Sequence, residues 1–155
     1  MINYLLANPQ VVVTVLLGFF TLIISWWFSS NNLKINHQKM EKELFSEFNR
    51  RYDLLNDSLS NLSGLNTIED LKNTGSLIEQ KSMYNVVIDY FNLCSEQYYW
   101  HKNNRISPEI WASWNAGMKF YYDNYAVVKL LWKDEIKSSG YKSYYLKKNV
   151  NFFEL

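Results

Sequence analysis

The first 33 residues contain no Asp, Glu, Lys or Arg, and the first charged side chain is Lys34. Residues 11–28 read VVVTVLLGFFTLIISWWF, eighteen residues that are nearly all bulky and apolar. A helix of this length covers about 27 Å at ~1.5 Å per residue, close to the ~30 Å hydrocarbon core of a bilayer. We therefore expect residues 11–28 to form one transmembrane helix.

A cleaved signal peptide and a buried core helix are the alternatives to a membrane anchor. Signal peptides have a basic start, a shorter apolar segment and a small-residue cleavage site. Residues 1–10 contain no Lys or Arg, and the apolar segment ends in Trp26-Trp27-Phe28. Lys34, Lys39 and Lys42 follow the segment, and basic residues beside a span stay in the cytoplasm. This predicts a single-pass protein with its N-terminus outside and its C-terminal domain cytoplasmic.

The small residues of the apolar segment recur at spacings of 4, 3 and 4, which places Thr14, Gly18, Thr21 and Ser25 on one helix face. Small residues let helices approach closely in lipid, where no hydrophobic force joins them. The pattern predicts an oligomer seam, and so a homo-oligomer. The alternative is that the four residues share a face by chance.

The remainder of the chain has the sequence pattern of an all-α protein. We expect residues 1–28 to form the N-terminal segment with its transmembrane helix, and residues 29–155 to form a cytosolic helical domain. Apolar residues recur at helical spacing from Leu33 to Leu62, which predicts a helix over 33–60. This helix either continues from the span or is separated from it at residues 29–32.

Capping patterns predict where the later helices begin. Thr67 with Asp70, and Ser76 with Glu79, have the spacing of a capping box, which predicts a short helical turn at 67 and a long helix from 76 to about 102, with Leu77 on its inner face. Ser107-Pro108-Glu109 predicts a helix ending near 123–124. Gly140 is expected to follow the C-terminus of another helix, and the tail from 141 to 155 is expected to be helical.

Several classes of chemistry are disfavoured by the residues present. The single Cys cannot form an internal disulfide, and the two His, 64 positions apart, give no ligand cluster, so we expect no metal and no cofactor. The five glycines do not form a phosphate-binding loop. Cys94 lies on the apolar face of its helix, where a buried thiol is favoured over a catalytic one. We assign no catalytic residue and expect that the chain is not an enzyme.

A binding role remains, because cations, amides and aromatic rings occur close together. Arginine pairs with phosphate in a planar fork, and aromatic rings stack on bases, so these residue types suit a nucleotide ligand. The alternatives are that Arg50 or Arg51 pairs with Glu47 or Asp53, that Trp111 and Trp114 belong to the core, and that the lysines of residues 129–155 meet anionic lipid. The candidate ligand-binding residues are Arg50, Arg51, His101, Lys102, Asn103, Asn104, Arg105 and Trp111.

A resemblance rests on three features: the uncharged span, the motif FNRRY at 48–52, and the segment SPEIWxxWxxGM at 107–118. In this layout the chain resembles small bacterial inner-membrane proteins with a helical cytosolic domain, and within them the membrane-anchored ancillary effectors of type III CRISPR defence. The resemblance implies a homo-oligomer, such as a tetramer, that binds cyclic tetra-adenylate and then damages the membrane or arrests growth.

The leading hypothesis is therefore an antiviral effector of the bacterial inner membrane, whose partners are the lipid bilayer, a cyclic oligonucleotide and further copies of itself. The alternative is a structural or inhibitory membrane protein whose helical domain docks a protein partner.

Overall fold

The computed structural model describes residues 8–154, and within them the chain is all-helical, as predicted. These residues contain no β-strand, only an isolated bridge between Gly75 and Ser82. The chain divides into two compact units, one up to Met40 and the other from Glu41 onward. The elements are α2 (Pro9–Leu59), η1 (Ser60–Leu62), α3 (Ile68–Asn73), α4 (Met83–Lys102), α5 (Pro108–Asn124), α6 (Ala126–Glu135), η2 (Gly140–Tyr144) and η3 (Phe152–Glu154).

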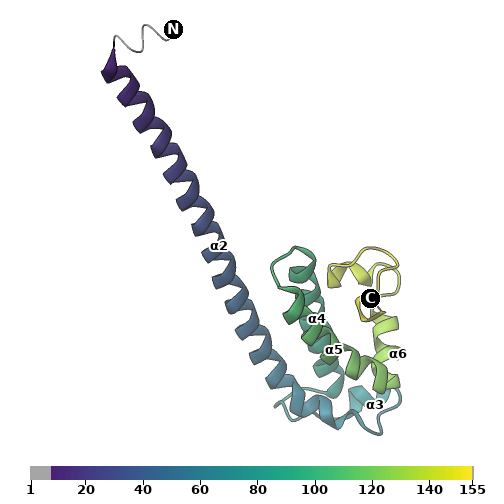
Figure 1. Cartoon of the computed structure of the whole chain (residues 1–155). Helices are drawn as coiled ribbons and strands as arrows, with labels where there is room; N and C mark the ends of the chain where they lie inside the picture. The colour runs from purple at the N-terminus through teal and green to yellow at the C-terminus, as the bar shows by residue number, and fades with distance from the viewer. Residues whose placement is uncertain (1–7, 155) are drawn as a thin grey trace. The chain divides into compact units, whose positions relative to one another are not determined.

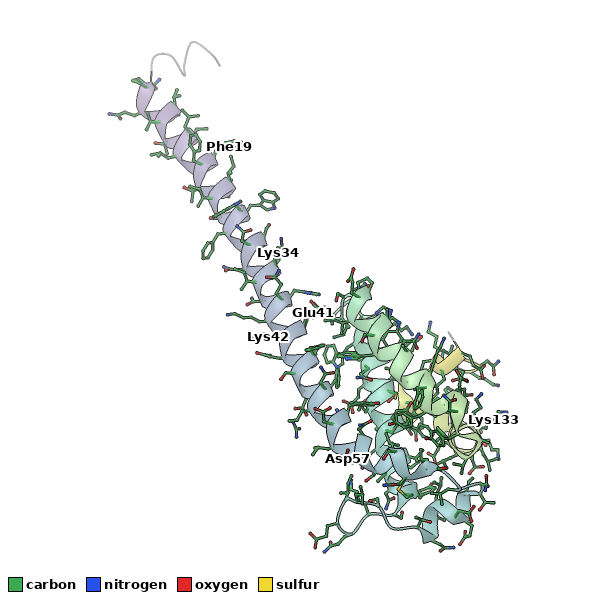
Figure 2. The ribbon with its side chains drawn as sticks, turned by 60° about the horizontal axis from the view of Figure 1, so that its bottom comes forward. Phe19, Lys34, Glu41, Lys42, Asp57 and Lys133 are labelled. Carbon is green, nitrogen blue, oxygen red and sulfur yellow. The ribbon has the colours of Figure 1, made fainter. Side chains whose placement is uncertain are left out.

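One uninterrupted helix, α2, contains both the apolar segment and the helix predicted at 33–60, which settles the open choice at residues 29–32 (Figure 1). Among the described residues, the apolar side chains at 13–28 of this helix are exposed: Leu22 is 69% exposed and Trp26 is 73% exposed. Phe19, labelled in Figure 2, is also exposed. The helix is long and apolar enough to cross a membrane, with a mean hydropathy of 2.3 over its most apolar window.

The small residues Thr14, Gly18, Thr21 and Ser25 all lie in α2 and are exposed. The hydroxyl of Thr14 donates to the carbonyl oxygen of Gln10, and that of Thr21 donates to the carbonyl oxygen of Leu17. These hydroxyl protons are therefore used within the helix. Close approach of a second helix at this face would rely on small size rather than on free donors.

The core of the second unit is aromatic and centres on Trp132 of α6. Trp132 is fully buried and meets the ring of Phe91 from α4 at a centroid distance of 5.0 Å. Phe152 and Phe153 pack on the same indole at 5.0 and 5.1 Å. The indole N–H donates to Oδ1 of Asn151 at 2.9 Å, so the polar atom of this buried ring is satisfied, as burial requires.

Several predicted helix starts are confirmed. Thr67 and Asp70 form the capping box that begins α3, with both reciprocal hydrogen bonds present. Pro108 is the first residue of α5, and that helix ends at Asn124. Cys94 is buried on α4, as its position on the apolar face predicted.

The predicted start of the long helix at Ser76 is wrong. The helix begins at Met83, where the hydroxyl of Ser82 accepts the N–H of Asn85. Residues 76–82 form a loop because Gln80 has a left-handed backbone, with φ of 61°, which a helix cannot contain. Leu77, expected on the inner face, is therefore 69% exposed.

The tail expected to be helical over 141–155 contains only the short turns η2 and η3. Left-handed residues interrupt it: Tyr145 has φ of 56° and Asn149 has φ of 65°. The predicted role of Gly140 is also wrong, because α6 ends at Glu135 and Gly140 begins η2. A Cβ atom on Gly140 would lie 1.8 Å from the carbonyl oxygen of Glu135, so close approach of the backbone explains this glycine.

Replacing Gly140 with Ala is expected to destabilise the second unit by roughly 1–3 kcal/mol, because either Glu135 or the turn must move. Thermal unfolding of the full chain in detergent micelles measures the effect. Gly75→Ala is the control, since a Cβ there meets nothing within 4 Å. Equal melting temperatures for the two variants would contradict the close approach.

Replacing Phe153 with Ala is expected to lower the free energy of unfolding by about 3–5 kcal/mol, the usual range for a buried phenylalanine. Phe153 is 2% exposed, whereas Phe120 is 54% exposed. Phe120→Ala removes the same side chain from the surface, so it should lower the free energy of unfolding by less than about 1 kcal/mol. Chemical denaturation of both variants tests whether the tail belongs to the core.

Candidate ligand-binding site

Six of the predicted ligand-binding residues lie in or beside the turn between α4 and α5. The helix α4 ends at Lys102, and its C-cap Asn103 donates from Nδ2 to the carbonyl oxygen of Tyr99 at 2.7 Å. Asn104 has φ of 55°, which turns the chain toward Pro108 at the start of α5. We name this set the turn site: His101, Lys102, Asn103, Asn104, Arg105 and Trp111.

Two planar side chains of the turn site are stacked. The rings of His101 and Trp111 lie parallel, with centroids 4.4 Å apart and planes at 4°. Burial lowers the pKa of His101, which favours a neutral imidazole at pH 7. Trp111 packs against the core, partly buried, with Tyr98 at 6.0 Å. Trp111 and Trp114 are each half-buried beside the core. The interpretation of these rings as core residues and the interpretation as ligand contacts therefore both stay open.

The two cations of the turn site are exposed. Lys102 places Nζ 6.0 Å from the ring centroid of Tyr98. Within residues 8–154 no carboxylate pairs with the Arg105 guanidinium or with the Lys102 ammonium. Both charges are therefore available to an anion from solution.

The start of α5 is occupied by a carboxylate that sequence reasoning missed. The backbone N–H of Ser107 donates to Oε1 of Glu41, labelled on α2 in Figure 2. The hydroxyl of Ser107 makes no capping hydrogen bond. A carboxylate at a helix N-terminus is stabilised by the helix dipole, so the place where a phosphate would bind this helix end is already filled.

Arg50 and Arg51 are both held in ion pairs. Arg50 donates two hydrogen bonds to Glu47, at 3.0 and 2.8 Å, on the exposed side of α2. This pairing is one of the alternatives that the sequence left open. Arg51 donates two hydrogen bonds to Glu96 of α4, at 2.6 and 3.0 Å, and the bond to Glu96 raises the pKa of Arg51. No sequence signal marked Glu96, because it is 45 residues away.

Arg51 also lines a cavity of about 450 Å³, which we name the ion-pair cavity. A second ion pair, between Lys81 and Asp89, lies in its wall. Leu54 and Ile78 supply apolar surface. Its four charges balance in two pairs, so an anionic ligand here would have to displace a carboxylate from Arg51 or Lys81.

Two further features bear on chemistry within residues 8–154, the thiol of Cys94 and the placement of the metal-ligating side chains. Burial raises the pKa of the Cys94 thiol far above its usual range, which keeps it neutral and unreactive. No group of three His, Cys, Asp or Glu side chains among these residues is placed to hold a metal ion.

Removing the Arg51–Glu96 ion pair is expected to lower the free energy of unfolding by more than removing the Arg50–Glu47 ion pair. The first is one-third exposed and joins two helices, whereas the second is half exposed or more and lies within one turn. A double-mutant cycle with Arg51→Gln and Glu96→Gln should give a coupling of about 1 kcal/mol, against ~0.3–0.5 kcal/mol for the control cycle on Arg50 and Glu47. Equal couplings would remove the structural role assigned to Arg51.

The geometry thus offers a turn site with exposed cations beside a stacked ring pair, and a separate ion-pair cavity that contains Arg51. Comparisons with protein-family models, with curated proteins and with solved structures find no match to this chain.

Proposed function

We propose that this chain is a single-pass protein of the bacterial inner membrane and that its helical domain lies in the cytoplasm and binds a ligand without catalysing a reaction. Support for the anchor comes from the apolar part of α2, which is exposed along its whole length. Support for the orientation comes from Lys34, Lys39 and Lys42, which follow the apolar segment, since basic flanks are retained inside the cell.

The proposed ligand is a cyclic oligonucleotide, with cyclic tetra-adenylate as the specific candidate, and the proposed role is that of an antiviral effector. The turn site is the observation that carries this proposal. Lys102 and Arg105 provide unpaired cations for phosphate, Asn103 and Asn104 lie between them, and the ring pair His101–Trp111 lies alongside. Charge-assisted hydrogen bonds of this kind contribute about 1.5–3 kcal/mol each.

The proposed effector is a homo-oligomer, and a tetramer would match a ligand with four repeated phosphates. A symmetric assembly presents the same arginine from each subunit, which multiplies one weak contact. Thr14, Gly18, Thr21 and Ser25 provide the proposed seam. Their small side chains allow close helix contact, and two of the hydroxyls are already bonded within α2.

A second candidate function, docking of a protein partner, is favoured by exposed leucines near the ion-pair cavity. Leu54 is 60% exposed and lines that cavity, and Leu77 is 69% exposed in the loop before α4. The backbone of Leu77 is hydrogen-bonded to the end of α2, where its N–H donates to the hydroxyl of Ser58 at 3.2 Å. Purification of the full chain from its host in mild detergent separates the candidates, since a docked partner co-purifies in stoichiometric amount without added nucleotide.

Replacing Leu22 with Lys is expected to reduce the membrane-inserted fraction of the chain, because a lysine near the centre of a span costs about 2.5–3.5 kcal/mol. Alkaline extraction of membranes from expressing cells measures this fraction. Leu33→Lys is a matched control outside the apolar segment, since Leu22 and Leu33 are both 69% exposed. Extraction of the wild-type chain without detergent would contradict the anchor.

Cyclic tetra-adenylate is expected to bind the full chain in detergent micelles with saturation, and linear tetra-adenylate to bind more weakly. Arg105→Gln should weaken binding by about 10- to 100-fold, which corresponds to one lost charge-assisted hydrogen bond. Lys137→Gln is the control, because Lys137 is an exposed cation paired with Asp134. Isothermal titration calorimetry measures these affinities. Titration of the Arg50→Ala and Arg51→Ala variants decides whether the arginines of α2 also contact the ligand. Absence of saturable binding to the wild-type chain would exclude the ligand.

A further inference from the structure

A second, smaller cavity of about 190 Å³ lies where α2, α4 and α5 meet, and we name it the amide cavity. Its floor is formed by buried side chains of α4, including Tyr90 and Gln97, while Ser113 of α5 is exposed at its edge. Pockets for drug-sized ligands measure about 300–1,000 Å³. The amide cavity therefore has room for one small ring system rather than for a whole nucleotide.

The chemistry of the amide cavity is polar but uncharged. None of its lining residues is Asp, Glu, Lys, Arg or His. Gln97 is only 4% exposed and lines the cavity, and its carboxamide is not among the fully buried polar groups that lack a hydrogen-bond partner within residues 8–154. A carboxamide presents a donor beside an acceptor, the pair that recognises the N6 and N7 edge of adenine.

Trp114 adds an aromatic ring to the same cavity lining. Trp114 donates from its indole N–H to Oδ1 of Asn49 at 3.1 Å. The ring of Phe45 stacks on it at 6.0 Å, and Phe48 meets it edge-on at 5.5 Å. The Nδ2 group of Asn49 is left as a second amide donor in the lining. Aromatic rings with amides beside them are the usual means of holding a flat base.

Gly117 provides an independent indication that the space is kept open. It lies inside α5, where glycine is unfavourable relative to alanine. A Cβ atom on Gly117 would meet nothing within 4 Å, and its φ is not in the left-handed region, so neither crowding nor backbone geometry requires glycine. Because Gly117 lines the amide cavity, a side chain here would occupy the cavity.

We propose that the amide cavity binds one uncharged planar heterocycle with an amide-like edge, a purine base in particular, through Gln97 and Asn49. This inference rests on the proposed function and deepens it, since the base is then one of those carried by the cyclic oligonucleotide. A free base or nucleoside offers the same chemistry, and the ligands tested distinguish the two sources.

The test compares adenine, adenosine, cyclic tetra-adenylate and ribose 5-phosphate by calorimetric titration of the full chain in detergent micelles. We expect the first three to bind and ribose 5-phosphate, which lacks a base, to give no heat from this cavity. Gly117→Leu should fill the cavity and weaken binding of adenine at least 10-fold. Ala116→Leu adds the same side chain at the exposed neighbouring position, which does not line the cavity, and should change the affinity less than twofold.

Two further variants separate loss of binding from loss of folding. Gly117→Ala should raise the melting temperature, because alanine favours the helix, and yet weaken adenine binding. Gln97→Met keeps a similar volume without the amide, so it should also leave the fold intact and reduce the affinity about 10-fold. A weakening in these two variants at an unchanged or higher melting temperature supports the inference.

The outcomes distinguish this inference from the proposed function. Binding of adenine with no binding of cyclic tetra-adenylate supports the amide cavity and excludes the proposed ligand. Binding of cyclic tetra-adenylate that is equal in the wild type, Gly117→Leu and Gln97→Met overturns the inference and leaves the proposed function standing. Absence of binding by adenine, adenosine and cyclic tetra-adenylate up to millimolar concentration overturns both.

Discussion

The apolar segment at 11–28 is almost wholly exposed among the described residues, and the cost of leaving it in water is the strongest physical constraint on this chain. A buried Val, Leu, Ile or Phe side chain gains about 1.5–3 kcal/mol relative to an exposed one. Eighteen consecutive residues left in water would therefore forgo tens of kcal/mol, more than the ~5–15 kcal/mol by which a whole domain is stable. In the proposed membrane anchor, lipid would supply these contacts.

Among the fully buried polar side-chain atoms of residues 8–154, two lack a hydrogen-bond partner, Nδ1 of His101 and Oδ1 of Asn115. The buried Trp132 donates to Asn151, and Arg51 is paired with Glu96. The cation of Arg105 has no carboxylate partner within residues 8–154, and the carboxamide of Gln97 lines the amide cavity. The first faces solvent and suits an anion, whereas the second is buried in an uncharged cavity and suits a neutral ring. Phosphate and base would thus be recognised in different chemical surroundings.

Local signals in the sequence predicted local structure well. The capping box at Thr67 and the Ser107-Pro108 start both depend on neighbouring residues, and both helices begin where predicted. The equivalent signal at Ser76 failed, because the left-handed backbone at Gln80 has no mark in the residue type. The tail failed for a tertiary reason, since Phe152 and Phe153 are placed by packing on Trp132 rather than by helical spacing. The residues of the turn site all lie between 101 and 111, so the sequence alone could group them, whereas Glu41, Glu96 and Gln97 depend on contacts between distant helices.

The position of Phe152 and Phe153 in the core also bears on how the protein is made. The ribosome completes residue 28 well before it reaches residue 152, an interval of about 6–25 s at roughly 5–20 residues per second. Until then Trp132 lacks two of its aromatic neighbours, Phe152 and Phe153, and Phe91 lacks Phe153. Under the proposed function, the anchor can thus enter the bilayer before the core of the domain behind it is complete.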